Sequence, residues 1–145
     1  RTVSSADVNA YLRDVTGGDY TAKDFRTWAG TLIAAEELRT LAATSSLPKT
    51  QKAAKSIIVH AIANVAGHLG NTPAVCRGSY IHPAVFAAHA EGSLARICES
   101  RRRRVRGLSP AETALLALLT SRHDLQTQLT AAVRAARAIS PERLP

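Results

Sequence analysis

Two short stretches of the sequence carry side chains suited to chemistry on a phosphodiester. AKDFRTWAGT holds Arg26, and LGNTPAVCRGSYIHP holds Asn71 and Tyr80. Negative charge grows on the non-bridging oxygens of a phosphodiester as a nucleophile adds, and an arginine offers permanently protonated donors to that charge. An asparagine adds an amide donor without a titratable group. A tyrosine can be the nucleophile, but a free tyrosine has a pKa of about 10 and therefore requires nearby cations or a proton acceptor.

Each of these residues also has an ordinary structural explanation. Arg26 stands beside Phe25 and Trp28 on a predicted helix, where a surface arginine is common. Asn71 precedes a Thr-Pro pair and is suited to cap a helix. Tyr80 could be an anchor whose hydroxyl stays in water. Taken one at a time, these explanations are favoured over catalysis.

The composition favours one helical domain with a polyanionic partner. Of the 145 residues 46% are hydrophobic, mostly Ala, Leu, Val and Ile, whereas only 4% are aromatic. Alanine and long charged side chains favour helix. The formal net charge of +8 comes mainly from arginine, whose guanidinium group matches phosphate oxygens, so nucleic acid is the expected partner. The alternative is a basic surface that binds nothing.

The same inventory disfavours other kinds of site and location. Cys76 and Cys98 form neither a metal motif nor a disulfide framework, which favours a reducing cytoplasm. The five histidines lack the paired spacing of a metal site, and no glycine-rich phosphate loop is present. The longest apolar stretch, residues 57–69, is interrupted by two histidines and an asparagine, so no membrane span is expected.

Periodicity and capping patterns predict successive helices with short connections. Thr21-Ala-Lys-Asp24 and Ser109-Pro110-Ala-Glu112 resemble capping boxes, and Asn71-Thr72-Pro73 suits the cap and first turn of a short helix. No alternating strand pattern or repeat is found, so the predicted fold is all-α, a compact bundle of about six to eight helices. The predicted helices cover residues 5–15, 21–41, 49–68, 73–80, 83–92, 93–106 and 110–139, the last as one helix or two. The predicted core face of the second helix consists of Phe25, Trp28, Leu32 and Ile33.

The two stretches, in this order, resemble type IB DNA topoisomerases, particularly their bacterial, poxvirus-like branch. The resemblance also takes in DVNAYLRDVTG at residues 7–17 and runs through most of residues 5–92. By position, Tyr80 matches the nucleophile and Arg26 an arginine of the catalytic set. Asn71 falls where many relatives have His and bacterial ones often have Asn. Together, and in family order, the three residues favour catalysis over three separate structural explanations.

The resemblance implies a complete reaction on double-stranded DNA. The tyrosine would form a 3′-phosphotyrosyl link and free a 5′-hydroxyl, the duplex would rotate, and the strand would be resealed. Because the link conserves the phosphodiester energy, neither ATP nor a metal nor any other cofactor is expected. We expect a monomer in the bacterial cytoplasm, associated with the nucleoid and not with a membrane.

Basic residues outside the three-residue site are candidate DNA contacts. Arg77 lies three residues before Tyr80, on the same helical face, and an arginine run ends the predicted helix 93–106. Tyrosine recombinases, which share the chemistry, usually have His-x-x-Arg where this chain begins with Lys23, and His at the position of Asn71. Both differences favour a topoisomerase over a recombinase. The predicted contacts are Lys23, Arg77, Arg101, Arg102, Arg103 and Arg104.

Part of the family's catalytic set has no counterpart in this sequence. The resemblance implies a second arginine and a lysine general acid on a β-hairpin well upstream of the Arg26 position, and an N-terminal clamp domain. Only 25 residues precede Arg26, and they are predicted to be helix and turn. We therefore expect a C-terminal catalytic portion, inactive alone, whose partner is the missing N-terminal part of the same protein.

Within this portion we expect one domain with two parts. Residues 1–92 would carry the catalytic site, and residues 93–145 would form basic and amphipathic helices packed on it. Two alternatives stay open: a tyrosine recombinase fragment, and a non-catalytic helical module that binds only the DNA backbone.

Overall fold

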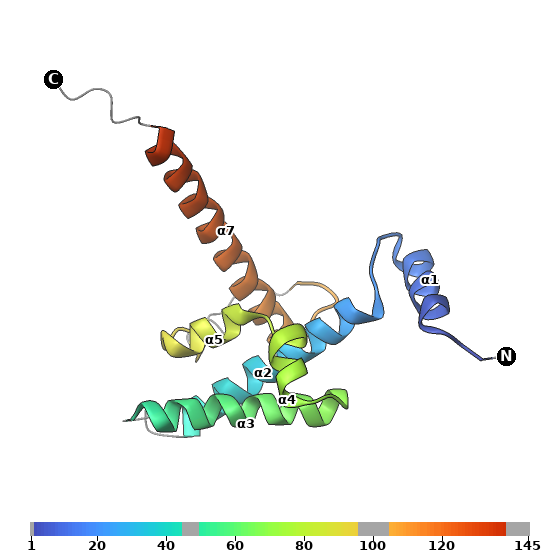
Figure 1. The fold of residues 1–145 in the computed structure, drawn as a ribbon, viewed down its shortest axis with the longest axis horizontal. Helices are drawn as coiled ribbons and strands as arrows, with labels where there is room; N and C mark the ends of the chain where they lie inside the picture. Colours follow the sequence, from blue (N-terminus) through green and yellow to red (C-terminus); the bar gives the residue numbers. More distant parts are fainter. Residues whose placement is uncertain (1, 45–49, 96–104, 139–145) are drawn as a thin grey trace.

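The computed structural model describes residues 2–44, 50–95 and 105–138, and these residues form helices joined by short turns (Figure 1). No strand occurs in these ranges, so the prediction of an all-α fold is confirmed. The elements are α1 (Ser5–Thr16), α2 (Ala22–Thr44), α3 (Gln51–Leu69), α4 (Pro73–Val75), the π-helical turn η1 (Cys76–Tyr80), α5 (Pro83–Ala90) and α7 (Pro110–Ala138).

Local hydrogen bonds explain why these helices begin and end where they do. Ser4 caps α1 in a reciprocal pair with Asp7, and Gly17 ends the helix with a φ of 66°. At the start of α7, Ser109 Oγ accepts from Glu112 N, while Glu112 Oε2 accepts from Ser109 N. The capping box predicted at the start of the last helix is therefore confirmed. That helix runs unbroken to residue 138, as one helix and not two.

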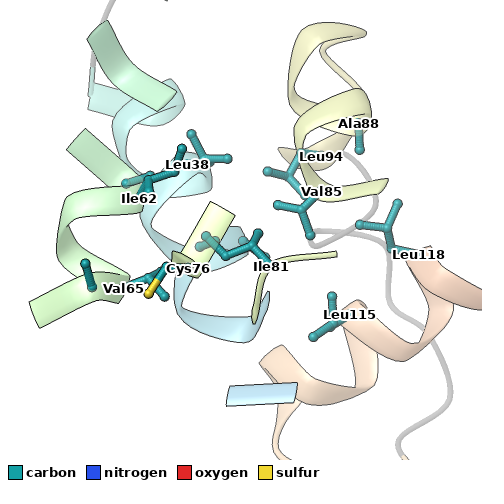
Figure 2. Packing of buried hydrophobic residues seen from close by; sticks show 14 residues of the cluster. Leu38, Ile62, Val65, Cys76, Ile81, Val85, Ala88, Leu94, Leu115 and Leu118 are labelled. Atoms are coloured by element: carbon teal, nitrogen blue, oxygen red, sulfur yellow. The ribbon is translucent and has the colours of Figure 1, made fainter. Parts of the chain in front are cut away.

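The core lies where α2 packs against α3, η1, α5 and α7, and where α3 also packs against η1. Buried alanines of both α2 and α3 belong to this core. Leu38, Val65, Val85 and Leu118 are fully buried. Figure 2 shows Cys76, the first residue of η1, and Ile81, which follows η1, among side chains from α3, α5 and α7. The turn that ends at Tyr80 is thus anchored in the core at both ends.

Two helices extend beyond this core. Helix α1 lies at one side of the molecule and has no buried residue (Figure 1). The outer half of α7 projects away from the bundle, and Leu125 and Leu129 on it are exposed. None of the helices in the described ranges is long and apolar enough to cross a membrane.

The structure corrects two predictions about the helices. Phe25 is 49% exposed and does not belong to the core. The core is contacted by Trp28, Leu32 and Ile33, as predicted. The predicted helix 93–106 does not reach its expected end, because Arg106 and Gly107 form a turn. Its middle, residues 96–104, lies outside the described residues.

Candidate active site

Arg26 projects from the first turns of α2 toward the end of α3. Thr21 and Asp24 fix the start of α2, since the Asp24 carboxylate accepts from both the backbone N–H and the hydroxyl of Thr21. One turn on, Arg26 Nη2 donates to the carbonyl oxygen of Leu69 at 2.6 Å. Leu69 is the last residue of α3, so its carbonyl belongs to the negative end of that helix. This contact places the arginine against the segment that leads to Tyr80.

Asn71 directs its amide to the same carbonyl. Asn71 Nδ2 donates to Leu69 O at 3.2 Å, and the side chain is partly buried. The cap of the following helix is Thr72, whose hydroxyl accepts from Val75 N. The structural explanation of Asn71 as a helix cap is therefore wrong. Arg26 and Asn71, 45 positions apart in sequence, instead bring their donors to one oxygen atom.

Tyr80 completes the group. Arg26 Cζ lies 5.1 Å from the centroid of the Tyr80 ring, within the range of a cation–π contact. Tyr80 is partly buried and is the last residue of η1. A π-helical turn is rare in proteins and is found frequently at functional sites. The structure thus brings together the three residues that the sequence singles out, around the end of α3.

The other predicted residues lie differently. Lys23 is exposed in the first turn of α2, three residues before Arg26 and on the same helical face. Arg77 is exposed on η1, and its guanidinium lies 5.8 Å from the ring centroid of Phe86. The run from Arg101 to Arg104 lies outside the described residues.

A hydrogen bond between Trp28 and Glu112 joins α7 to α2. Trp28 Nε1 donates to Glu112 Oε1 at 3.3 Å. The pKa of Glu112 is lowered because its carboxylate accepts hydrogen bonds from the Ser109 backbone, and further from the Ser109 side chain and Trp28. Sequence analysis missed this link, since Glu112 was explained by its cap alone. It also missed the Leu69 carbonyl, which no side-chain motif could indicate.

Comparison with known proteins assigns this sequence to a family. Residues 1–102 match the family described as the eukaryotic DNA topoisomerase I catalytic core, and this range contains Arg26, Asn71 and Tyr80. The chain belongs to the type IB DNA topoisomerase family. A relative, DNA topoisomerase 1B of Acanthamoeba polyphaga mimivirus, is 32% identical over 120 residues. That match covers 72% of this chain and 35% of the viral protein.

The family match confirms the resemblance inferred from the sequence. The viral relative shows how much of a topoisomerase this chain corresponds to. This chain spans about a third of the length of the viral topoisomerase, since the match covers 35% of it. The family range ends at residue 102, so α7 lies beyond it, although Leu115 and Leu118 of α7 belong to the same core.

Proposed function

We propose that this chain is the tyrosine-bearing portion of a type IB DNA topoisomerase, with Tyr80 as its nucleophile. The Tyr80 hydroxyl oxygen would form a bond to the phosphorus of a DNA phosphodiester while the bond to the 5′-oxygen breaks. The tyrosine loses its proton, and the leaving 5′-oxygen gains one and departs as a hydroxyl. The reverse step reseals the strand, so that supercoils relax without ATP or a metal.

The observation that carries this proposal is the convergence of two donors beside the tyrosine ring. Arg26 Nη2 and Asn71 Nδ2 meet at one carbonyl oxygen, and the Arg26 guanidinium lies next to the Tyr80 ring. An oxygen atom with partial negative charge already satisfies both donors. A non-bridging phosphate oxygen carries more negative charge and would compete for them, most strongly in the transition state.

Arg26 is suited to this exchange. A guanidinium group has five N–H donors, and only one of those on Arg26 has a partner within the described ranges. Its remaining donors can therefore bind a second phosphate oxygen once the first has displaced the Leu69 carbonyl. Asn71 adds a second donor of fixed direction, and Lys23 and Arg77 are exposed nearby in sequence to contact flanking phosphates.

Replacement of Tyr80 tests the nucleophile directly. In the complete protein, Tyr80→Phe removes only the phenolic oxygen, so covalent adduct formation should be lost while DNA affinity stays nearly unchanged. Adducts are trapped with denaturant on a 5′-labelled strand and counted on a gel. Tyr11→Phe is the matched control, because Tyr11 lies on α1 and is 65% exposed. A normal adduct yield in Tyr80→Phe would remove Tyr80 from the mechanism.

The same assay separates the other candidate functions. A helical module that binds only the DNA backbone would give no adduct in any variant. A recombinase would give the adduct but would require a partner DNA site, whereas a topoisomerase relaxes a supercoiled plasmid that has none. Relaxation in EDTA without ATP supports the topoisomerase.

We further propose that the general acid and the second arginine lie outside these 145 residues. The isolated chain should then bind duplex DNA weakly, with affinity that falls steeply with salt, and should fail to relax plasmid. A substrate with sulfur in place of the bridging 5′-oxygen tests the missing acid. A thiol has a pKa of about 8.5 and leaves as thiolate without a proton.

The comparison of sulfur and oxygen substrates gives the expected size of the effect. General acid catalysis contributes about 10²–10⁴-fold. Sulfur substitution should therefore accelerate cleavage by the isolated chain by about that factor more than cleavage by the complete protein. Robust plasmid relaxation by the isolated chain would show that the acid lies inside these residues.

A further inference from the structure

Helix α2 touches the main chain of Tyr80 at Gly30. A Cβ atom placed on Gly30 would lie 2.5 Å from the Tyr80 carbonyl oxygen, and 3.1 Å from Leu69 Cδ1. The first distance is far shorter than a carbon and an oxygen tolerate, and the oxygen belongs to backbone that cannot rotate away. Any side chain at position 30 would therefore displace the main chain of Tyr80.

A glycine in this place is costly for the helix itself. Glycine in a helix interior is less favourable than alanine, because its backbone loses more freedom on folding. Gly67, inside α3, meets the same penalty, but a Cβ there would have no atom within 4 Å. The two glycines are alike in helix propensity and differ in what they face.

Thr31, the residue after Gly30, hydrogen-bonds to the main chain that follows Tyr80. Thr31 is 2% exposed, and its hydroxyl accepts from the backbone N–H of His82 at 3.1 Å. The same hydroxyl donates to the carbonyl of Thr27 at 2.6 Å, which fixes its orientation. Thr27 Oγ1 in turn lies 3.4 Å from the carbonyl oxygen of Ser79. The main chain thus contacts α2 at Ser79 and at Tyr80, and it is hydrogen-bonded to α2 at His82, two residues after Tyr80.

Arg26 and Gly30 lie on one face of α2, because they are four residues apart, and Thr27 and Thr31 form the neighbouring row with the same separation. Arg26 contacts the tyrosine ring, while Gly30 and Thr31 contact the tyrosine's backbone and that of a near neighbour. One rigid helix therefore carries both the cation of the site and the support of the nucleophile.

We propose that Gly30 and Thr31 are positioning residues that seat the main chain of Tyr80 on α2 and so set where its hydroxyl meets the phosphate. This inference rests on the proposed function, since it gives Tyr80 a reacting oxygen to position. Neither residue touches DNA in this account. Their replacement should change the rate of the covalent step and leave DNA affinity unchanged.

The first experiment compares the two glycines in the complete protein. Adduct formation is measured in single turnover at saturating DNA, and DNA affinity is measured separately. Gly30→Ala should slow the covalent step by about 100-fold, because a displacement of roughly 1 Å has that cost in a positioned reaction. Its DNA affinity should match the wild type. Gly67→Ala should retain both rate and affinity.

The second experiment serves where Gly30→Ala disturbs folding. Thr31→Val keeps the shape of the side chain but removes the acceptor of the His82 N–H, and the covalent step should slow about tenfold. Thr31→Ser keeps the hydroxyl and should restore the rate to within about twofold of wild type, whatever either change does to the melting temperature. A purely structural role would instead make the rate at a temperature well below melting the same in all three proteins.

The outcomes separate this inference from the function on which it rests. If the wild type forms no adduct that depends on Tyr80, the proposed function fails and this inference with it. If the wild type forms the adduct, and Gly30→Ala and Thr31→Val react at the wild-type rate, the positioning inference alone is overturned. A loss of DNA affinity equal to the loss of rate would also overturn it.

Discussion

The turn that bears Tyr80 and helix α1 differ in how well local sequence rules explain them and in how deeply they are buried. Helix α1 follows local rules closely, with a reciprocal capping box at Ser4 and a left-handed glycine at its end. It nevertheless buries no residue, and Tyr11 and Val15 on it are 65% and 64% exposed. The Tyr80 turn is a rare π-helix, yet it is anchored in the core at both ends. Local sequence decides whether a helix forms, whereas tertiary contacts decide whether a residue is held in place.

The two regions therefore differ in how precisely they can position a side chain. The role proposed for Tyr80 requires its hydroxyl to be held within a fraction of an ångström, and α2 contacts both its ring and its backbone. Helix α1, by contrast, buries no side chain. Its main tie to α2 among the described residues is Asn9 Oδ1, which accepts from Ala22 N at 3.0 Å.

The largest expected difference between the two regions is in stability. Leu38 is fully buried on α2, so Leu38→Ala should lower the free energy of unfolding of this chain by about 2–5 kcal/mol. Val15→Ala on α1 should change it by less than about 0.5 kcal/mol, since surface substitutions have little effect. Urea denaturation of both variants measures the difference. A comparable loss in Val15→Ala would mean that α1 packs on the core in solution.

The second difference is in catalysis and concerns two arginines. Arg26→Ala in the complete protein should slow cleavage and religation by about 10²–10³-fold, the cost of one preorganised donor to a developing oxyanion. Arg26→Lys should recover only part of this rate, because lysine lacks the planar fork. Arg13→Ala is the control: Arg13 lies on α1, 3.7 Å from an exposed Asp19 carboxylate. Single-turnover rates and DNA affinity are measured for each. If Arg26→Ala weakened binding as much as rate, Arg26 would be a ground-state phosphate contact.

Those parts of the fold that depend on neighbours in the sequence could be predicted from it. The starts of α1, α2 and α7 follow from side chains three residues apart, and glycines mark the ends of α1 and α3. The grouping of Arg26 with Asn71 and Tyr80 could be predicted only through the family resemblance, because nothing local links Arg26 to residues 45 and 54 positions further along.

The remaining features depend on backbone atoms or on three-dimensional packing. The Leu69 carbonyl is present in any sequence, so no residue type marks it as the point where two donors meet. Gly30 looks like an unfavourable helix residue until the Tyr80 carbonyl is found beside it. Phe25 has the spacing of a core residue, but it lies beside Tyr20 and Trp28 at a surface hollow. Periodicity gives the face of a helix and not what covers it.

The smallest predicted effect concerns the contact that joins α7 to α2. Hydrogen bonds from Ser109 and Trp28 lower the pKa of Glu112 below the ordinary glutamate value of about 4.3. The folded state therefore binds this proton less readily than the unfolded chain. The stabilising contribution is complete above that ordinary value and is lost as the pH falls through the lowered one.

Trp28 reports this loss, because it is the only tryptophan in the chain and donates to Glu112. Its fluorescence should change in a single step below about pH 4.3. Glu112→Gln keeps an oxygen for Trp28 and cannot titrate, so the step should vanish. Glu91→Gln should leave the step in place, because Glu91 pairs with Arg122 and its own lowered pKa has that separate cause. A step that survives in Glu112→Gln would assign the titration to another carboxyl group. The contact between Trp28 and Glu112 would then contribute nothing measurable to holding α7 against α2.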